Sequence, residues 1–124
     1  METFYIQRNV FEFVIQASQN VYPKEFSGLL RGEKNLITET LVIPLTTYGD
    51  KFSSTRFDMI PIDHSIIGSV HSHPSRNFKP SEADLNYFKK IGKVHLIVCY
   101  PYQGLGSIAA YDREGNKIEL VLVD

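Results

Sequence analysis

The segment from His71 to Asp84 limits the possible fold and function of this chain more than any other segment. It joins metal-binding side chains to residues that fix the backbone. His71 and His73 stand two apart at the end of an apolar run, and residues two apart on an extended backbone point to the same face. Imidazole is a common zinc ligand. Pro74 ends the strand, and Pro80 closes the turn that follows. We therefore expect two imidazoles to converge on one point at a strand end.

Ser81 and Asp84 follow the turn and open a predicted helix. A carboxylate there would complete a His/His/Asp set, and three protein ligands with an open fourth position is the catalytic zinc arrangement, whereas structural sites use four. The same two residues also fit a capping box. Taken singly, a histidine pair is weak evidence, and Ser81 and Asp84 are better explained as caps. Their joint spacing favours a metal site, and Ser81 can serve both purposes.

The remaining segments predict a mixed β-sheet with flanking helices, an α/β or α+β fold. Apolar residues at helical spacing indicate a helix over 9–21, with Asn9 and Glu12 as its cap and Pro23 beyond its end. A second helix is expected over 81–91. Apolar or β-branched runs bounded by turn residues predict strands over 26–31, 36–45, 56–60, 66–71, 94–100, 107–111 and 117–123.

Two stretches are less defined by pattern. Residues 46–55 are polar and aperiodic, which predicts a loop. Phe4, Tyr5 and Ile6 form an apolar start that either completes the core or makes a dimer contact, and the sequence leaves a homodimer open.

Composition narrows the function classes. At 124 residues the chain is expected to form a single domain over 1–124. A net charge of -1 gives no electrostatic case for nucleic acid or an anionic membrane as partner. We find neither an apolar run of membrane-spanning length nor a signal-peptide layout, so we expect a cytoplasmic protein. Cys99 is the single cysteine, which excludes a multi-cysteine zinc site and a deaminase-like P-C-x-x-C enzyme.

Three further residues that bind metals in other proteins have simpler explanations here. His64 lies in a connecting segment and is expected to be solvated. His95 begins an apolar strand and is expected to be a satisfied core residue or a group behind the ligands. Cys99 lies inside an apolar run and is expected to be a small core residue.

The segment from His71 to Asp84 resembles the signature of the JAMM (MPN+) metalloprotease family. That signature is His-Ser/Thr-His-Pro followed by S-x-x-D, with the aspartate eleven residues after the second histidine, as Asp84 is here. The family also has an upstream P-x-E-x-x-G-L-L-x-G segment, which residues 23–32 fit. Two separated motifs in the right order make the resemblance specific, and it covers nearly the whole chain. It implies the family's JAB/MPN fold, a β-sheet core with flanking helices similar to cytidine deaminases.

The resemblance also implies roles. His71, His73 and Asp84 would ligate Zn²⁺, and Ser81 would donate a hydrogen bond to the oxyanion. Glu25 would be the general base that a zinc hydrolase needs; taken alone, it would be a solvated loop carboxylate beside Lys24. Family members cleave after the C-terminal Gly-Gly of ubiquitin-like modifier or sulfur-carrier proteins, and this compact form most resembles archaeal members. A non-catalytic scaffold of the same fold is the alternative, although such relatives typically lack the ligands.

One departure from the larger family members concerns substrate choice. They carry an insertion after the motif helix, whereas here Gly92, the expected helix stop, and Lys93 lead directly into Val94. We therefore expect the 46–55 loop to order as a substrate tail adds as a strand, so deleting Ser53 and Ser54 should weaken cleavage without loss of zinc.

Overall fold

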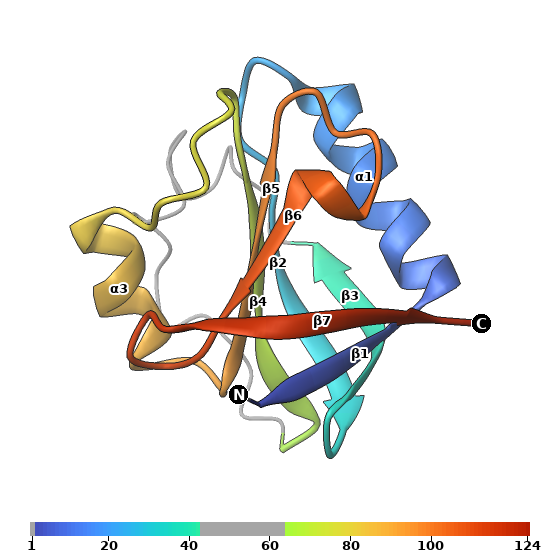
Figure 1. Cartoon of the computed structure of the whole chain (residues 1–124), viewed down its shortest axis with the longest axis vertical. Coiled ribbons are helices and arrows are strands. Elements are labelled where there is room, and N and C mark those ends of the chain that lie inside the picture. The colour runs from blue at the N-terminus through green and yellow to red at the C-terminus, as the bar shows by residue number, and fades with distance from the viewer. Residues whose placement is uncertain (1, 43–63) are drawn as a thin grey trace.

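The computed structural model describes residues 2–42 and 64–124, and in these ranges a strongly curved sheet carries two α-helices (Figure 1). In chain order the elements are β1 (Thr3–Gln7), α1 (Arg8–Val21), β2 (Ser27–Glu33), β3 (Leu36–Val42), β4 (Ile66–His73), α3 (Glu82–Phe88), β5 (Val94–Cys99), the 3-10 turn η3 (Leu105–Ser107), β6 (Ile108–Tyr111) and β7 (Lys117–Val123).

The sheet closes on itself in the order β1-β3-β2-β4-β5-β6-β7. Closure depends on β1, which pairs in parallel with β3 on one side and with β7 on the other. The pair β4–β5 is also parallel, and the remaining pairs are antiparallel. The predicted mixed sheet with flanking helices is therefore confirmed, and its closure into a barrel is an addition.

Strand β1 resolves the question left open for the apolar start of the chain. Phe4 and Ile6 are fully buried in the main core, while Tyr5 between them is 41% exposed, which is the alternation of a strand with one buried face. Phe4 and Ile6 therefore complete the core.

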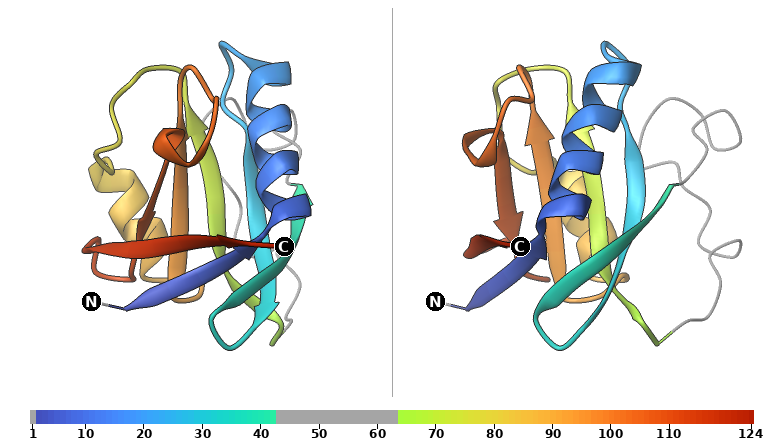
Figure 2. Two further views of the ribbon diagram at one scale, coloured as in Figure 1. Left: turned by 45° about the vertical axis from the view of Figure 1, so that its right-hand side comes forward. Right: turned by 90° about the vertical axis from the view of Figure 1, so that its right-hand side faces the viewer.

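Helix α1 confirms the predicted helix but not its cap. The helix lies against the barrel (Figure 2). Val10 and Val14 are buried, whereas Phe13, expected on the same stripe, is 45% exposed. The capping residue is Gln7, without a side-chain hydrogen bond, so the predicted Asn9 cap is wrong. The reason is that β1 runs into α1 without a loop, which places the cap position on the last strand residue.

The two faces of the sheet bury separate clusters. The main cluster fills the barrel and packs against α1, and it includes Val70, Leu96 and Val98. The second cluster lies on the outer face beneath α3 and consists of Phe88, Ile97, Cys99, Ala109 and Tyr111, with Phe78 and Leu85 packed against it. It holds α3 against the centre of the sheet.

Helix α3 is shorter than the predicted 81–91. Ser81 is its cap, and the helix ends at Phe88. Gly92 lies beyond the helix with a φ of 60°, and a Cβ there would stand 2.3 Å from the backbone of Ile67. Gly92 therefore makes the turn into β5 beside Ile67, and it is not the residue at the helix end.

Several predictions fall on residues 43–63, outside the described residues. They are the end of the 36–45 strand, the 46–55 loop with Ser53 and Ser54, and the strand over 56–60. Within the described ranges, the helices are all too short or too polar to cross a membrane.

Candidate metal centre

Strand β4 carries two of the predicted ligands at its end. It is held on both sides: β2 pairs Ser27 with His71, and β5 pairs Cys99 with His73. His71 is 1% exposed, and Ser72 between the histidines is fully buried. The central position of β4 gives both imidazoles a rigid backbone.

Helix α3 brings the third predicted ligand to the same place. The capping box is confirmed, because Ser81 Oγ accepts from the Asp84 backbone N–H at 3.0 Å and Asp84 Oδ2 accepts from the Ser81 N–H at 2.8 Å. This ties the carboxylate to the first helical turn, where Asp84 is 5% exposed. Its Oδ1 lies 3.3 Å from His71 Nε2, and its Oδ2 lies 3.5 Å from His73 Nε2.

The three side chains fit a metal ion. The two Nε2 atoms are 3.1 Å apart, and the ligand atoms of His71, His73 and Asp84 all lie within 4.8 Å of one another. Zinc–nitrogen bonds of 2.0–2.1 Å at a tetrahedral angle place two ligand atoms about 3.3 Å apart. The spacing of the three side chains matches that value.

The environment of His73 also fits a metal ligand. Its Nδ1 lies 2.8 Å from the carbonyl oxygen of Asn77, which can only accept, so Nδ1 carries the hydrogen in this contact. In the neutral ring Nε2 is then the free acceptor that faces Asp84 and His71. Cys99 Sγ donates to the same Asn77 carbonyl at 3.2 Å.

The site stabilises positive charge beside the carboxylate. Burial opposes charge on His73, but hydrogen bonds with Asp84, Cys99 and Asn77 outweigh it and raise the pKa of His73 to about 10. Burial likewise opposes ionisation of Asp84, but hydrogen bonds from His71 and His73 hold the pKa of Asp84 well below its usual range. Without a metal, the cluster retains a proton that a divalent cation would replace.

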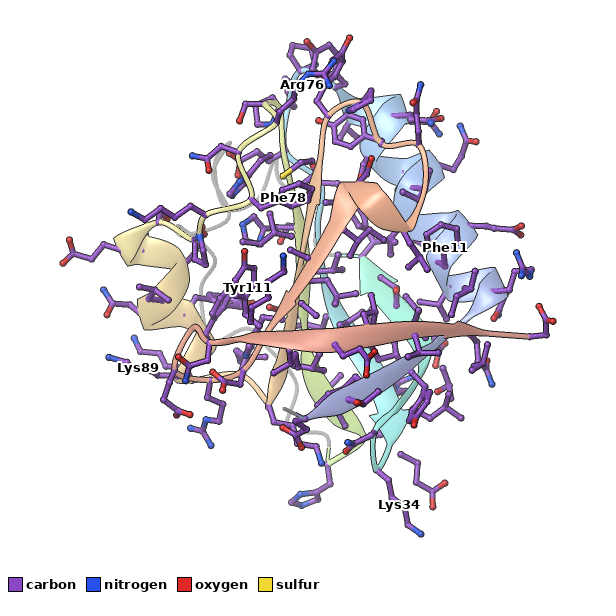
Figure 3. All side chains as sticks on the ribbon, viewed as in Figure 1. Phe11, Lys34, Arg76, Phe78, Lys89 and Tyr111 are labelled. Atoms are coloured by element: carbon purple, nitrogen blue, oxygen red, sulfur yellow. The ribbon has the colours of Figure 1, made fainter. Side chains whose placement is uncertain are left out.

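Two tyrosines support the turn between His73 and α3. Tyr102 Oη donates to the His73 carbonyl at 2.9 Å, and Tyr111 Oη donates to the Phe78 carbonyl at 2.8 Å. Phe78 and Tyr111 lie between α3 and the sheet (Figure 3). Sequence reasoning did not find these tyrosines, because their role depends on which strands become neighbours. Cys99 is buried as predicted, and its bond to Asn77 is additional.

Glu25 lies immediately before β2 and is partly buried. The β2–β4 register pairs Ser27 with His71, and Phe26 and Ser72 extend it through hydrogen bonds. Continued by one residue, this antiparallel register places Glu25 beside His73. In the described residues, the group with ligand atoms within 4.8 Å of one another contains His71, His73 and Asp84 but not Glu25. Glu25 therefore lies outside the ligand set, and the continued register directs it toward His73.

The two remaining histidines lie apart from the ligand set. His64 is exposed, as expected. His95 is fully buried, its Nδ1 lies 2.7 Å from Ser69 Oγ, and its ring stacks on Phe88 with centroids 4.2 Å apart. The prediction that His95 is a core residue is confirmed.

Residues 7–113 match a family described as prokaryotic homologues of the JAB domain. The chain belongs to this family. A relative from Haloferax volcanii, named a probable metalloprotease, is 37% identical over 96% of this chain and 79% of its own length.

Two solved structures place this JAB domain among the JAMM proteins. One, described as a JAMM metalloprotease-like zinc site in the proteasome and signalosome, is 33% identical, with a TM-score of 0.76 over 99% of this chain and all of the other. The second, a JAB1/MPN domain protein from Archaeoglobus fulgidus, is 36% identical, with a TM-score of 0.78 over 98% of this chain and all of the other. A Desulfitobacterium hafniense protein, 16% identical at a TM-score of 0.61 over 98% of this chain and 93% of its own, shares the fold. The predicted family and its fold are confirmed.

Proposed function

We propose that this JAB domain is a zinc-dependent peptidase or isopeptidase that cleaves after the C-terminal Gly-Gly of a ubiquitin-like modifier or sulfur-carrier protein. The observation that carries the proposal is the convergence of His71, His73 and Asp84 within 4.8 Å. The continued β2–β4 register supports a position for Glu25 near His73. The relative named a probable metalloprotease supports the reaction class. The proposal takes residues 1–124 as one domain and the cytoplasm as its location.

Each residue has a distinct task in this proposal. His71, His73 and Asp84 hold Zn²⁺, which would act as a Lewis acid on the attacking water and the scissile carbonyl. Glu25 accepts a proton from the attacking water as the C–O bond forms, and it then delivers this proton to the leaving nitrogen as the C–N bond breaks.

Ser81 stabilises the carbonyl oxygen as it becomes negative. The Ser81 hydroxyl is at the surface, and its oxygen accepts from the Asp84 N–H. Its hydrogen remains available to donate, so the cap and the proposed catalytic role use different parts of one hydroxyl group.

The burial of the site supports a substrate whose backbone is narrow at the scissile bond. His71 is 1% exposed and Asp84 is 5% exposed, so a scissile bond must approach closely to reach them. Glycine lacks a Cβ and allows the closest approach of a backbone to another group, which suits a Gly-Gly tail. A non-catalytic scaffold is less favoured, because a complete ligand set with an adjacent glutamate has no use in one.

A cleavage assay tests this function. The substrates are ubiquitin-like modifiers and sulfur carriers joined through their C-terminal Gly-Gly to a lysine amine or to a linear peptide. Cleavage should stop on adding a chelator and return with zinc, and Glu25→Gln should keep the metal but lose at least about 100-fold in turnover. Full activity of Glu25→Gln, or cleavage indifferent to the chelator, would contradict the mechanism. Failure on the whole panel would contradict the substrate class.

A further inference from the structure

The residue between the two predicted ligands makes an unusual pair of contacts. Ser72 is fully buried and faces away from the histidines into the sheet's other side. Its Oγ accepts from the backbone N–H of Phe26 at 2.7 Å, and its own backbone N–H donates to the Phe26 carbonyl at 2.9 Å. Two hydrogen bonds therefore join Ser72 to the residue that follows Glu25.

The hydroxyl takes the place of a backbone acceptor. In a regular antiparallel hydrogen-bonded pair, two facing residues exchange N–H and carbonyl groups. Here the carbonyl of Phe26 is used in that way, but its N–H bonds to the side chain of Ser72. Strand β2 begins one residue later, at Ser27, so this hydroxyl holds the chain to β4 just beyond the regular ladder.

Phe26 transmits this constraint to its neighbour. Its ring is buried in the main core and makes a T-shaped contact with the ring of Phe13, with the centroids 6.2 Å apart. With the ring anchored in the core and both backbone polar groups bonded to Ser72, Phe26 has little freedom to move. Glu25 is attached directly to this fixed residue, so its backbone position is set from β4.

We infer that Ser72 is a positioning residue for Glu25. Its hydroxyl fixes where the proposed general base stands relative to His71 and His73 on the same strand. The inference rests on the proposed function of Glu25 as the proton acceptor. The metal ligands do not depend on this hydroxyl, because β5, Asn77 and Tyr102 hold the ligand end of β4 independently.

Removing the hydroxyl should separate catalysis from metal binding. In Ser72→Ala the N–H of Phe26 loses its acceptor, and Glu25 is free to move from its place. We expect kcat to fall about 10- to 100-fold, since a 1 Å misplacement has an effect of that size. KM and zinc affinity should stay within about twofold of the original values. Ser72→Thr keeps the hydroxyl and should restore most of kcat, and Ser72→Cys, with a weaker acceptor of similar size, replaces the alanine variant if that one does not fold.

Ser69→Ala is the matched control. Ser69 lies on the same strand, is equally buried, and its Oγ is bonded to His95 and not to the segment that carries Glu25. It should lose stability much as Ser72→Ala does, while kcat stays within about twofold. A similar fall of kcat in both variants would show a general effect of a lost buried hydrogen bond and would overturn the inference.

The same assays distinguish a failure of the positioning role of Ser72 from a failure of the proposed function. Each variant is assayed on the same Gly-Gly conjugate as Glu25→Gln, with zinc content measured on the same sample. If Glu25→Gln keeps full turnover, the proposed base itself is wrong. If Glu25→Gln loses turnover, the proposed function stands. The positioning role of Ser72 is then overturned by either of two results: Ser72→Ala keeps the original kcat, or Ser72→Ala loses zinc together with kcat.

Discussion

His73 is constrained at both ring nitrogens and at its backbone carbonyl. Its Nδ1 is bonded to Asn77, its Nε2 faces Asp84 and His71, and its carbonyl accepts from Tyr102. Because one nitrogen is occupied by a carbonyl, the other is fixed as the metal-facing atom. The ring orientation is therefore set by the protein before a metal binds.

His95 makes the fold sensitive to acid. Burial lowers the pKa of His95 to about 3 from an ordinary value of 6.5, so the unfolded chain binds a proton that the folded chain excludes. The stability due to the neutral ring is complete above pH 6.5 and is lost as pH falls toward 3. The free energy of unfolding should fall by up to about 1.4 kcal/mol per pH unit in this window.

His95→Gln is the comparison for this effect. Glutamine is neutral at every pH and can still bond to Ser69. Urea unfolding from pH 7 to 4, with a chelator present throughout so that metal release does not contribute, should give a flatter pH dependence in the variant. Parallel curves for the two proteins would contradict the assignment.

The sequence predicts those site residues whose positions depend on local spacing. His71, His73 and Asp84 were predicted to converge because strand periodicity and a capping box fix their directions locally, and the structure brings them together. Glu25 came only from family resemblance, because nothing in its neighbourhood marks it. The contacts of Ser72 depend on the β2–β4 register, which no local pattern encodes.

Among the elements, α3 combines a structural cap with a proposed catalytic hydroxyl, and the two can be measured separately. Ser81→Ala removes the acceptor of the Asp84 N–H, which should lower stability by about 1 kcal/mol. If Ser81 also donates to the developing negative charge, turnover should fall at least about 100-fold at a temperature where the variant is folded.

Ser81→Thr keeps both functions and should resemble the original protein in denaturant unfolding and in initial rates. A Ser81→Ala protein that loses the expected stability but cleaves within about twofold of the original rate would show that the hydroxyl is only a cap.

Elements formed by residues close together in the sequence were predicted correctly, and those that depend on residues far apart in the sequence were not. The strands predicted over 26–31 and 36–45 correspond to β2 and β3, and those over 107–111 and 117–123 correspond to β6 and β7. Each pair is antiparallel across a short turn. The predicted end of α3 was wrong, because Gly92 makes the turn beside Ile67, which is distant in sequence, and does not end the helix. Strand β1 was missed because its partners, β3 and β7, lie far along the chain.

For the molecule as a whole, barrel closure is the feature that sequence reasoning did not reach. A mixed sheet follows from the alternation of apolar runs and turns, but closure requires β1 to pair with β7 from the other end of the chain (Figure 1). Periodicity identifies a strand without naming its neighbour. The sequence therefore predicted the layers of the fold but not the order of its strands.

The importance of closure can be measured at Phe4. Phe4 pairs with Leu120 across the β1–β7 closure, and its side chain is fully buried in the main core. Phe4→Ala should therefore lower the free energy of unfolding by about 3–5 kcal/mol. Tyr5→Ala, at a neighbouring position that is 41% exposed, should lower it by less than about 1 kcal/mol. Equal losses in denaturant unfolding would show that β1 does not anchor the barrel.

In the proposed mechanism, His71, His73 and Asp84 hold one catalytic metal. Calorimetric titration of zinc into the chelator-treated protein at pH 7 tests it most directly. We expect about one zinc per chain, with release of protons because hydrogen bonds with Asp84, Cys99 and Asn77 raise the pKa of His73 in the metal-free site. His71→Ala and Asp84→Ala should each lose this binding. Zinc binding of unchanged stoichiometry and affinity in both variants, or none in the original protein, would contradict the account.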